Sequence, residues 1–179
     1  DTDCNAGNVG SILGVMDGID GIPDAYREPI NDGVVLSGIS GYLNILDLPT
    51  YAKKVYALGC GLAGRTVPVQ DIVKEGEIHF DFSLPGSTHC FRVSDPFLCR
   101  IRHSDTGRQD GHGSIEILFD RMVRGQGCKV FYKNFYRRKD FSDERYMPVF
   151  SPTAYAGQTV SFSIRAERFS GESVVIQPY

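Results

Sequence analysis

The segment Thr159–Phe169 (TVSFSIRAERF) has the clearest period-two alternation in the chain, and it decides the predicted fold. Its apolar residues Val160, Phe162, Ile164 and Ala166 alternate with polar ones. Successive side chains of a β-strand point to opposite faces of a sheet, so this pattern is typical of a strand with one buried face. The segment therefore predicts a half-buried strand.

Similar short segments recur along the chain after residue 30. The chain contains twenty glycines and nine prolines, which punctuate it at short intervals. Pro49–Lys54 and Ser142–Met147 could each form one helical turn, and neither predicts a longer helix. The expected strands are Val34–Ser40, Tyr42–Leu48, Lys53–Leu58, Glu77–Phe82, His89–Val93, Phe97–His103, Ser114–Phe119, Lys129–Phe135 and Ser173–Gln177. About ten short strands with frequent turns favour an all-β fold, and specifically a single β-sandwich resembling a jelly roll.

The first 30 residues differ from the rest in composition. Residues 1–30 are rich in Gly, Asp and Asn and contain one apolar patch, Val9–Met16. They predict an N-terminal arm, followed by a sandwich domain over residues 31–179. Such an arm either packs along its own sandwich or adds to a sheet edge of a neighbouring subunit.

Charge and composition exclude several classes of protein. The net charge of −3 and the pI of about 5.8 argue against a nucleic-acid partner. No apolar run approaches the roughly 18 to 20 residues of a transmembrane helix. The first residue is not Met, and an odd number of cysteines is present. We therefore expect a secreted or cell-surface protein with up to two internal disulfide bonds, formed among Cys4, Cys60, Cys90, Cys99 and Cys128.

An acidic turn joins the arm to the rest of the chain. It runs from Asp17 to Glu28 and contains the stretch Asp20-Gly21-Ile22-Pro23-Asp24. This stretch resembles the core of thrombospondin type 3 calcium repeats, in which alternate carboxylates and a glycine turn surround the ion. The resemblance implies calcium as a cofactor, with Asp17, Asp20, Asp24 and Glu28 as candidate ligands.

A second candidate site combines aromatic and basic residues. The segment Lys129–Lys139 interleaves rings with positive charges. Rings stack on sugar faces, and Arg or Lys side chains bind anionic groups. The segment predicts a glycan-binding surface, with these candidate residues: Tyr132, Phe135, Tyr136, Arg137 and Arg138. The alternative is a strand with one core row and a solvated basic row.

Catalytic signals are weak. No GxSxG or HExxH motif and no recognisable Cys-His signature is present. The loop His103–His112 contains two His and two Asp residues that could bind a transition metal if they converged. The sequence therefore leaves enzymatic activity uncertain and favours its absence.

These observations predict a structural or adhesive subunit that self-associates through its N-terminal arm and sheet edges. The first alternative is a carbohydrate-binding module that uses the aromatic and basic surface. The second is a metal-dependent hydrolase built on the His103–His112 loop.

Overall fold

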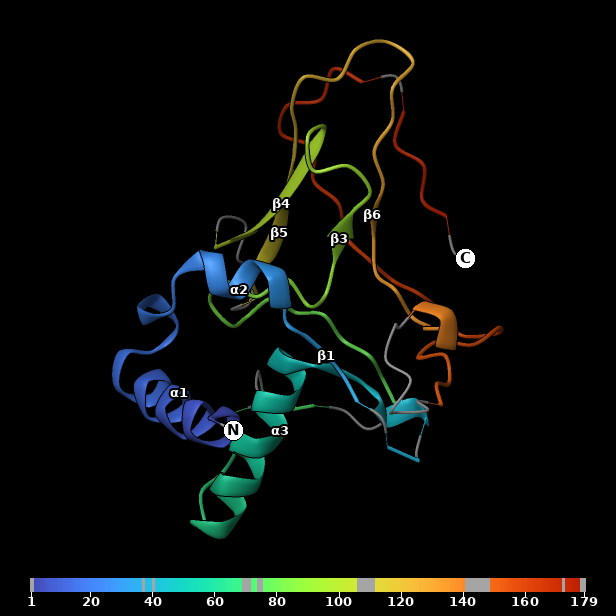
Figure 1. The fold of residues 1–179 in the computed structure, drawn as a ribbon. Helices are drawn as coiled ribbons and strands as arrows, with labels where there is room; N and C mark the ends of the chain where they lie inside the picture. The colour runs from blue at the N-terminus through green and yellow to red at the C-terminus, as the bar shows by residue number, and fades with distance from the viewer. Residues whose placement is uncertain are drawn as a thin grey trace.

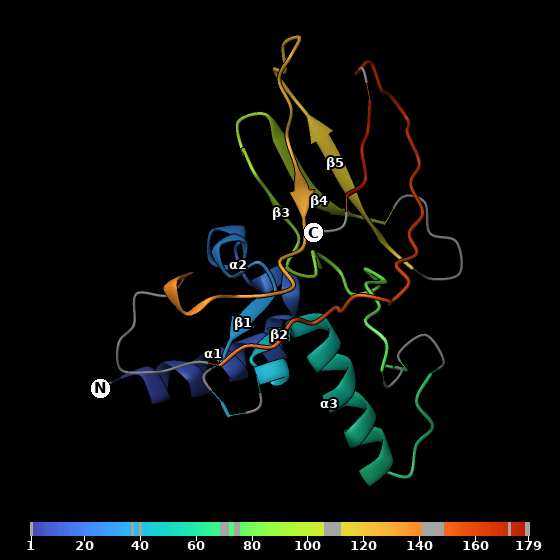
Figure 2. The ribbon, with the colours of Figure 1, turned by 90° about the vertical axis from the view of Figure 1, so that its right-hand side faces the viewer.

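A computed structural model describes the chain except residues 1, 37, 40, 69–71, 74–75, 106–111, 141–148, 172 and 178–179. The helical elements are α1 (Asp3–Asp17), η1 (Ile19–Gly21), α2 (Asp24–Ile30), η2 (Gly41–Leu43), α3 (Leu48–Leu62) and η4 (Arg138–Asp140). The strands are β1 (Gly33–Val35), β2 (Ile45–Asp47), β3 (Arg92–Val93), β4 (Cys99–Ser104), β5 (Ser114–Phe119) and β6 (Val130–Phe131). Figures 1 and 2 show α1 and α3 at one end of the molecule, with β3 to β6 at the other.

The strands of the described chain pair only in twos. β1 pairs with β2, β3 with β6 and β4 with β5, all antiparallel. The longest ladder runs from Cys99 opposite Phe119 to Ser104 opposite Ser114. Each sheet therefore has two edge strands and no interior strand.

The predicted jelly-roll sandwich is wrong. The structure combines three α-helices with small two-stranded sheets, and its described residues form no closed sandwich. Thr159–Phe169, which decided the prediction, contains no strand, and Val160, Phe162 and Ile164 are exposed. Alternation forms a strand only where a neighbouring backbone supplies hydrogen bonds. No described segment does so here.

Two further features of the predicted fold are also corrected. The arm, expected to be irregular or extended, contains α1 and α2, and the expected strand Lys53–Leu58 lies inside α3. No disulfide bond is formed, because all five cysteines are free thiols.

The helix boundaries follow from local chemistry. Asp3 lies in the first turn of α1, where the helix dipole favours a negative charge, and Gly18 ends the helix at φ 67°. α2 ends at Asn31, which adopts the left-handed conformation that Asn tolerates. Pro49 lies in the first turn of α3, where its missing N–H costs nothing.

The centre of the molecule is unusually polar. The most deeply buried described side chains include Asn44, Lys53, Asp81 and His89. An aromatic cluster adjoins them: Phe80 packs on Phe91 and Tyr132 with centroid distances of 5.3 and 4.9 Å. This small cluster and the polar centre hold β3, β6 and the segment 80–91 together.

Candidate functional site

The apolar face of α1 is exposed to solvent. Val9, Ile12, Leu13 and Met16 follow the spacing i, i+3, i+4, i+7, which places them in one stripe. Each is between 48% and 71% exposed, and no residue of α1 is buried. The stripe is therefore available to a partner helix.

Helix α3 exposes its apolar face and buries a charged residue, the reverse of an ordinary surface helix. Its apolar stripe, Tyr51, Val55, Leu58 and Leu62, is between 49% and 93% exposed. Its buried residues include the charged Lys53. A helix on the surface of a globular domain normally buries its apolar face. The exposed stripe is therefore a second surface available for contact.

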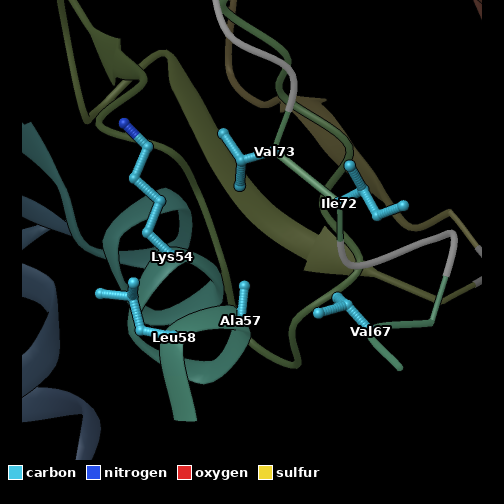
Figure 3. A pocket seen from close by; sticks show the side chains of 6 residues that line it. All are labelled: Lys54, Ala57, Leu58, Val67, Ile72 and Val73. Atoms are coloured by element: carbon cyan, nitrogen blue, oxygen red, sulfur yellow. The ribbon is translucent and has the colours of Figure 1, made fainter. Parts of the chain in front are cut away.

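A groove beside α3 adds to this surface. It has a volume of about 460 Å³, within the range of roughly 300 to 1,000 Å³ for ligand pockets. Its lining residues are Lys54, Ala57, Leu58, Val67, Ile72 and Val73. Figure 3 shows Lys54, Ala57 and Leu58 on α3 opposite the other three, with the Lys54 ammonium at one end. Apart from Lys54, the lining residues that the structure describes are apolar.

The exposed area is large for a chain of this length. The chain exposes 14242 Å². A compact protein of 19.8 kDa would expose about 8,600 Å². A standard interface buries about 800 Å² per partner. The excess is several times what one stable interface would cover.

A buried ionic cluster connects α3 to the loop that carries His89. Lys53 Nζ donates to Asp81 Oδ2, and His89 Nδ1 lies 2.7 Å from Asp47 Oδ2. Asp32 Oδ2 accepts the backbone N–H groups of Thr88 and His89 at 2.6 and 3.0 Å. The cluster joins segments separated by up to 57 residues, so it fixes their relative positions.

The protonation states in the cluster follow from these contacts. Burial disfavours the charged form of His89, but hydrogen bonds to Asp47 and Asp81 outweigh it and raise its pKa to about 9. The Phe82 N–H, 3.3 Å from Nε2, would suit a neutral ring, whereas Asp81 Oδ1 is 3.8 Å from the same atom. Two carboxylates beside one imidazole favour the charged form. Burial raises the pKa of Asp81, but hydrogen bonds from His89, Lys53 and Ser83 hold it well below its usual range.

This cluster is better suited to structure than to catalysis. His89 is only 2% exposed and Lys53 only 7%. A general acid or base must reach its substrate, and neither side chain does so here. Its loop is also strained: His89 and Cys90 have φ values of 48° and 65°, and the backbone N–H groups that Thr88 and His89 donate to Asp32 support this conformation. The cluster therefore orients α3 and its exposed stripe.

The cysteines differ in their surroundings. Burial raises the pKa of Cys90 to about 12, and Asp47 and Asp32 add to the shift. Burial and a hydrogen bond with Cys128 raise the pKa of Cys99 to about 12 as well. At neutral pH both remain thiols, which are poor nucleophiles. Cys4 on α1 is exposed.

The residues predicted to bind glycans do not share one surface. Tyr132 packs against Phe80 and Phe91, and Tyr136 packs against Phe150 with Lys133 over its ring. Phe135 is 38% exposed, whereas Arg137 pairs with Asp140 at 3.2 Å. Arg138 is exposed. A glycan site here stays an untested prediction.

The predicted calcium ligands occupy the junction between α1 and α2. Asp17 ends α1, Asp20 lies in η1, and Asp24 and Glu28 lie on α2, where Asp24 pairs with Arg27 at 2.5 Å. Within the described ranges, no three His, Cys, Asp or Glu side chains converge in a way that could hold a metal ion. Calcium binding stays a prediction.

Most of the predicted His103–His112 loop lies outside the described residues, which exclude 106–111. His103 Nε2 is 2.9 Å from the Phe82 carbonyl oxygen. Neither the ionic cluster nor the α3 stripe was predicted from the sequence. The spacing 51, 55, 58, 62 is helical and could have identified the stripe.

Comparisons with known proteins identify no relative. No protein-family model, no curated protein and no solved structure matches this chain. Among the described residues, the helices are all too short or too polar to cross a membrane. A functional assignment must therefore rest on the surfaces described above.

Proposed function

We propose that this chain is an assembly module that self-associates through the exposed apolar stripe of α1. The observation that carries the proposal is this stripe: Val9, Ile12, Leu13 and Met16 all face solvent on one side of a helix of 15 residues. Apolar patches of this kind on soluble proteins typically mark interaction sites. The proposal retains the arm that the sequence predicted, with a helix in place of a strand.

The energetics support such a contact. Full burial of an Ile, Leu or Met side chain contributes about 1.5 to 3 kcal/mol. The four stripe residues are about half to two-thirds exposed, so each offers about 1 to 2 kcal/mol. Together they supply several kcal/mol, which is offset in part by the cost of association. We therefore expect weak self-association that depends on protein concentration.

Two substitutions on the same helix test the proposal. Leu13→Gln removes an apolar side chain from the stripe, whereas Ser11→Gln changes an exposed residue on the opposite side of α1. We expect the wild type to associate with rising concentration, measured by light scattering. Leu13→Gln should raise the dissociation constant about tenfold or more, and Ser11→Gln should leave it within about twofold. Equal effects of the two changes, or a wild type that stays monomeric, would overturn the proposal.

An alternative is a glycan-binding role for the aromatic and basic surface. Phe135 and Arg138 support it, because both reach solvent. Because Tyr132 packs against Phe80 and Phe91, less ring area is available for stacking on a sugar. Self-association therefore has the stronger support.

A further inference from the structure

The groove beside α3 has the chemistry to receive apolar side chains of a helix. Its walls are Ala57 and Leu58 on one side and Val67, Ile72 and Val73 on the other, so it would accept apolar side chains. Lys54 stands at one end of it (Figure 3). Such helix-in-groove contacts use apolar anchors spaced i, i+3, i+4 and i+7. α1 carries that spacing.

The C-terminal end of α1 is negatively charged. Asp17 is its last residue, no basic residue lies in its last turn, and Asp20 follows in η1. The C-terminus of a helix also carries a partial negative charge from its aligned peptide dipoles. Among the residues that the structure describes, neither Asp17 nor Lys54 has an ion-pair partner. Both charges are therefore available to a second molecule.

We infer that the α3 groove of one copy receives α1 of a second copy, with Asp17 of the incoming helix beside Lys54. This inference rests on the proposed function and names the surface that completes it. The helix and the groove are different surfaces, so the contact is heterologous. Repetition of it produces a ring if the rotation closes, and an open polymer if it does not.

The exposed area suits this arrangement. Each copy uses both surfaces, one as donor and one as receiver. The excess of exposed area over that of a compact chain is large enough for two interfaces of about 800 Å² per partner. Of the α3 stripe, Leu58 lines the groove and would be covered by the incoming helix.

Charge reversal tests the pairing. Lys54→Glu places two acids together in the contact, and Asp17→Lys places two bases together. Each single variant should weaken self-association about three- to tenfold, measured by light scattering across a range of protein concentration. An equimolar mixture of the two variants should restore wild-type association, because each contact between unlike copies then pairs opposite charges. Lys139→Glu, on the exposed η4 helix, is the matched control and should have no effect.

The outcomes separate the two proposals. If the wild type associates and Leu13→Gln prevents it, but the mixture restores nothing, the self-association proposal survives and the groove assignment is overturned. If the wild type never associates, the self-association proposal itself fails. Rescue in the mixture but not in either variant alone would support the α1–groove contact specifically.

Discussion

Replacement of Lys53 by Met should lower the free energy of unfolding more than a substitution at an exposed lysine does. Lys53 is 7% exposed, and its ammonium donates to Asp81, which is 8% exposed. Lys53→Met keeps the length of the side chain but leaves the Asp81 carboxylate buried without its main cation. Breaking a buried ion pair by removing one partner costs about 3 to 5 kcal/mol.

The surrounding contacts place the expected cost at the lower end of that range. Asp81 still accepts the Ser83 N–H at 3.1 Å and lies 3.8 Å from His89 Nε2. We therefore expect a loss of about 3 kcal/mol in the free energy of unfolding. The double variant Lys53→Met/Asp81→Asn removes both charges and keeps an acceptor for Ser83, so it should lose only about 1 to 2 kcal/mol.

Urea unfolding followed by circular dichroism at low protein concentration measures these differences. Lys54→Met is the matched control, because Lys54 is the next residue on α3 and is exposed. It should change the free energy of unfolding by less than about 0.5 kcal/mol. A Lys53→Met variant as stable as this control would refute the buried pair, as would a double variant less stable than Lys53→Met alone.

Further predictions concern the titration and reactivity of buried groups. The pKa of His89 is raised from 6.5 to about 9, so its contribution to stability is complete below pH 6.5 and is lost as the pH rises towards 9. This loss is about 3 kcal/mol. The urea midpoint of the wild type should therefore fall between pH 6.5 and 9, and that of His89→Gln should not show this pH dependence. Alkylation at pH 8 should modify the exposed Cys4 at least about tenfold faster than Cys90 or Cys99, as peptide mass spectrometry would show; equal rates would contradict the burial of the latter two. Leu58→Gln should weaken self-association about tenfold without lowering stability, because Leu58 is 70% exposed; a loss of stability instead would place Leu58 in a core.

Part of the fold was predictable from short-range patterns. β5 has the predicted bounds Ser114–Phe119, and β4 lies within one residue of its predicted end. The two segments pair with each other and lie close in the sequence, so local alternation was enough. The long-range layout was not predictable in this way, because it depends on whether a strand finds a partner backbone. Thr159–Phe169 has the pattern but no partner in the described chain.

The helices were missed for a different reason. Gly7, Gly10 and Gly14 each lower the helix propensity of α1 by about 1 kcal/mol. The apolar patch Val9–Met16 was therefore not predicted to be helical. In α3, the segment Lys53–Leu58 was predicted as a strand, although it lies inside the helix and Lys53 is buried. The ionic cluster joins residues 32, 47, 53, 81 and 89, and no local pattern links them. Only the three-dimensional arrangement shows that they meet.

The most direct test of the account is the mass of the chain in solution, measured by light scattering from low to high protein concentration. The account predicts a mass that rises above 19.8 kDa over the same concentrations in the wild type and in Ser11→Gln, and only at about tenfold higher concentration in Leu13→Gln. A wild-type mass of 19.8 kDa at every concentration would contradict it.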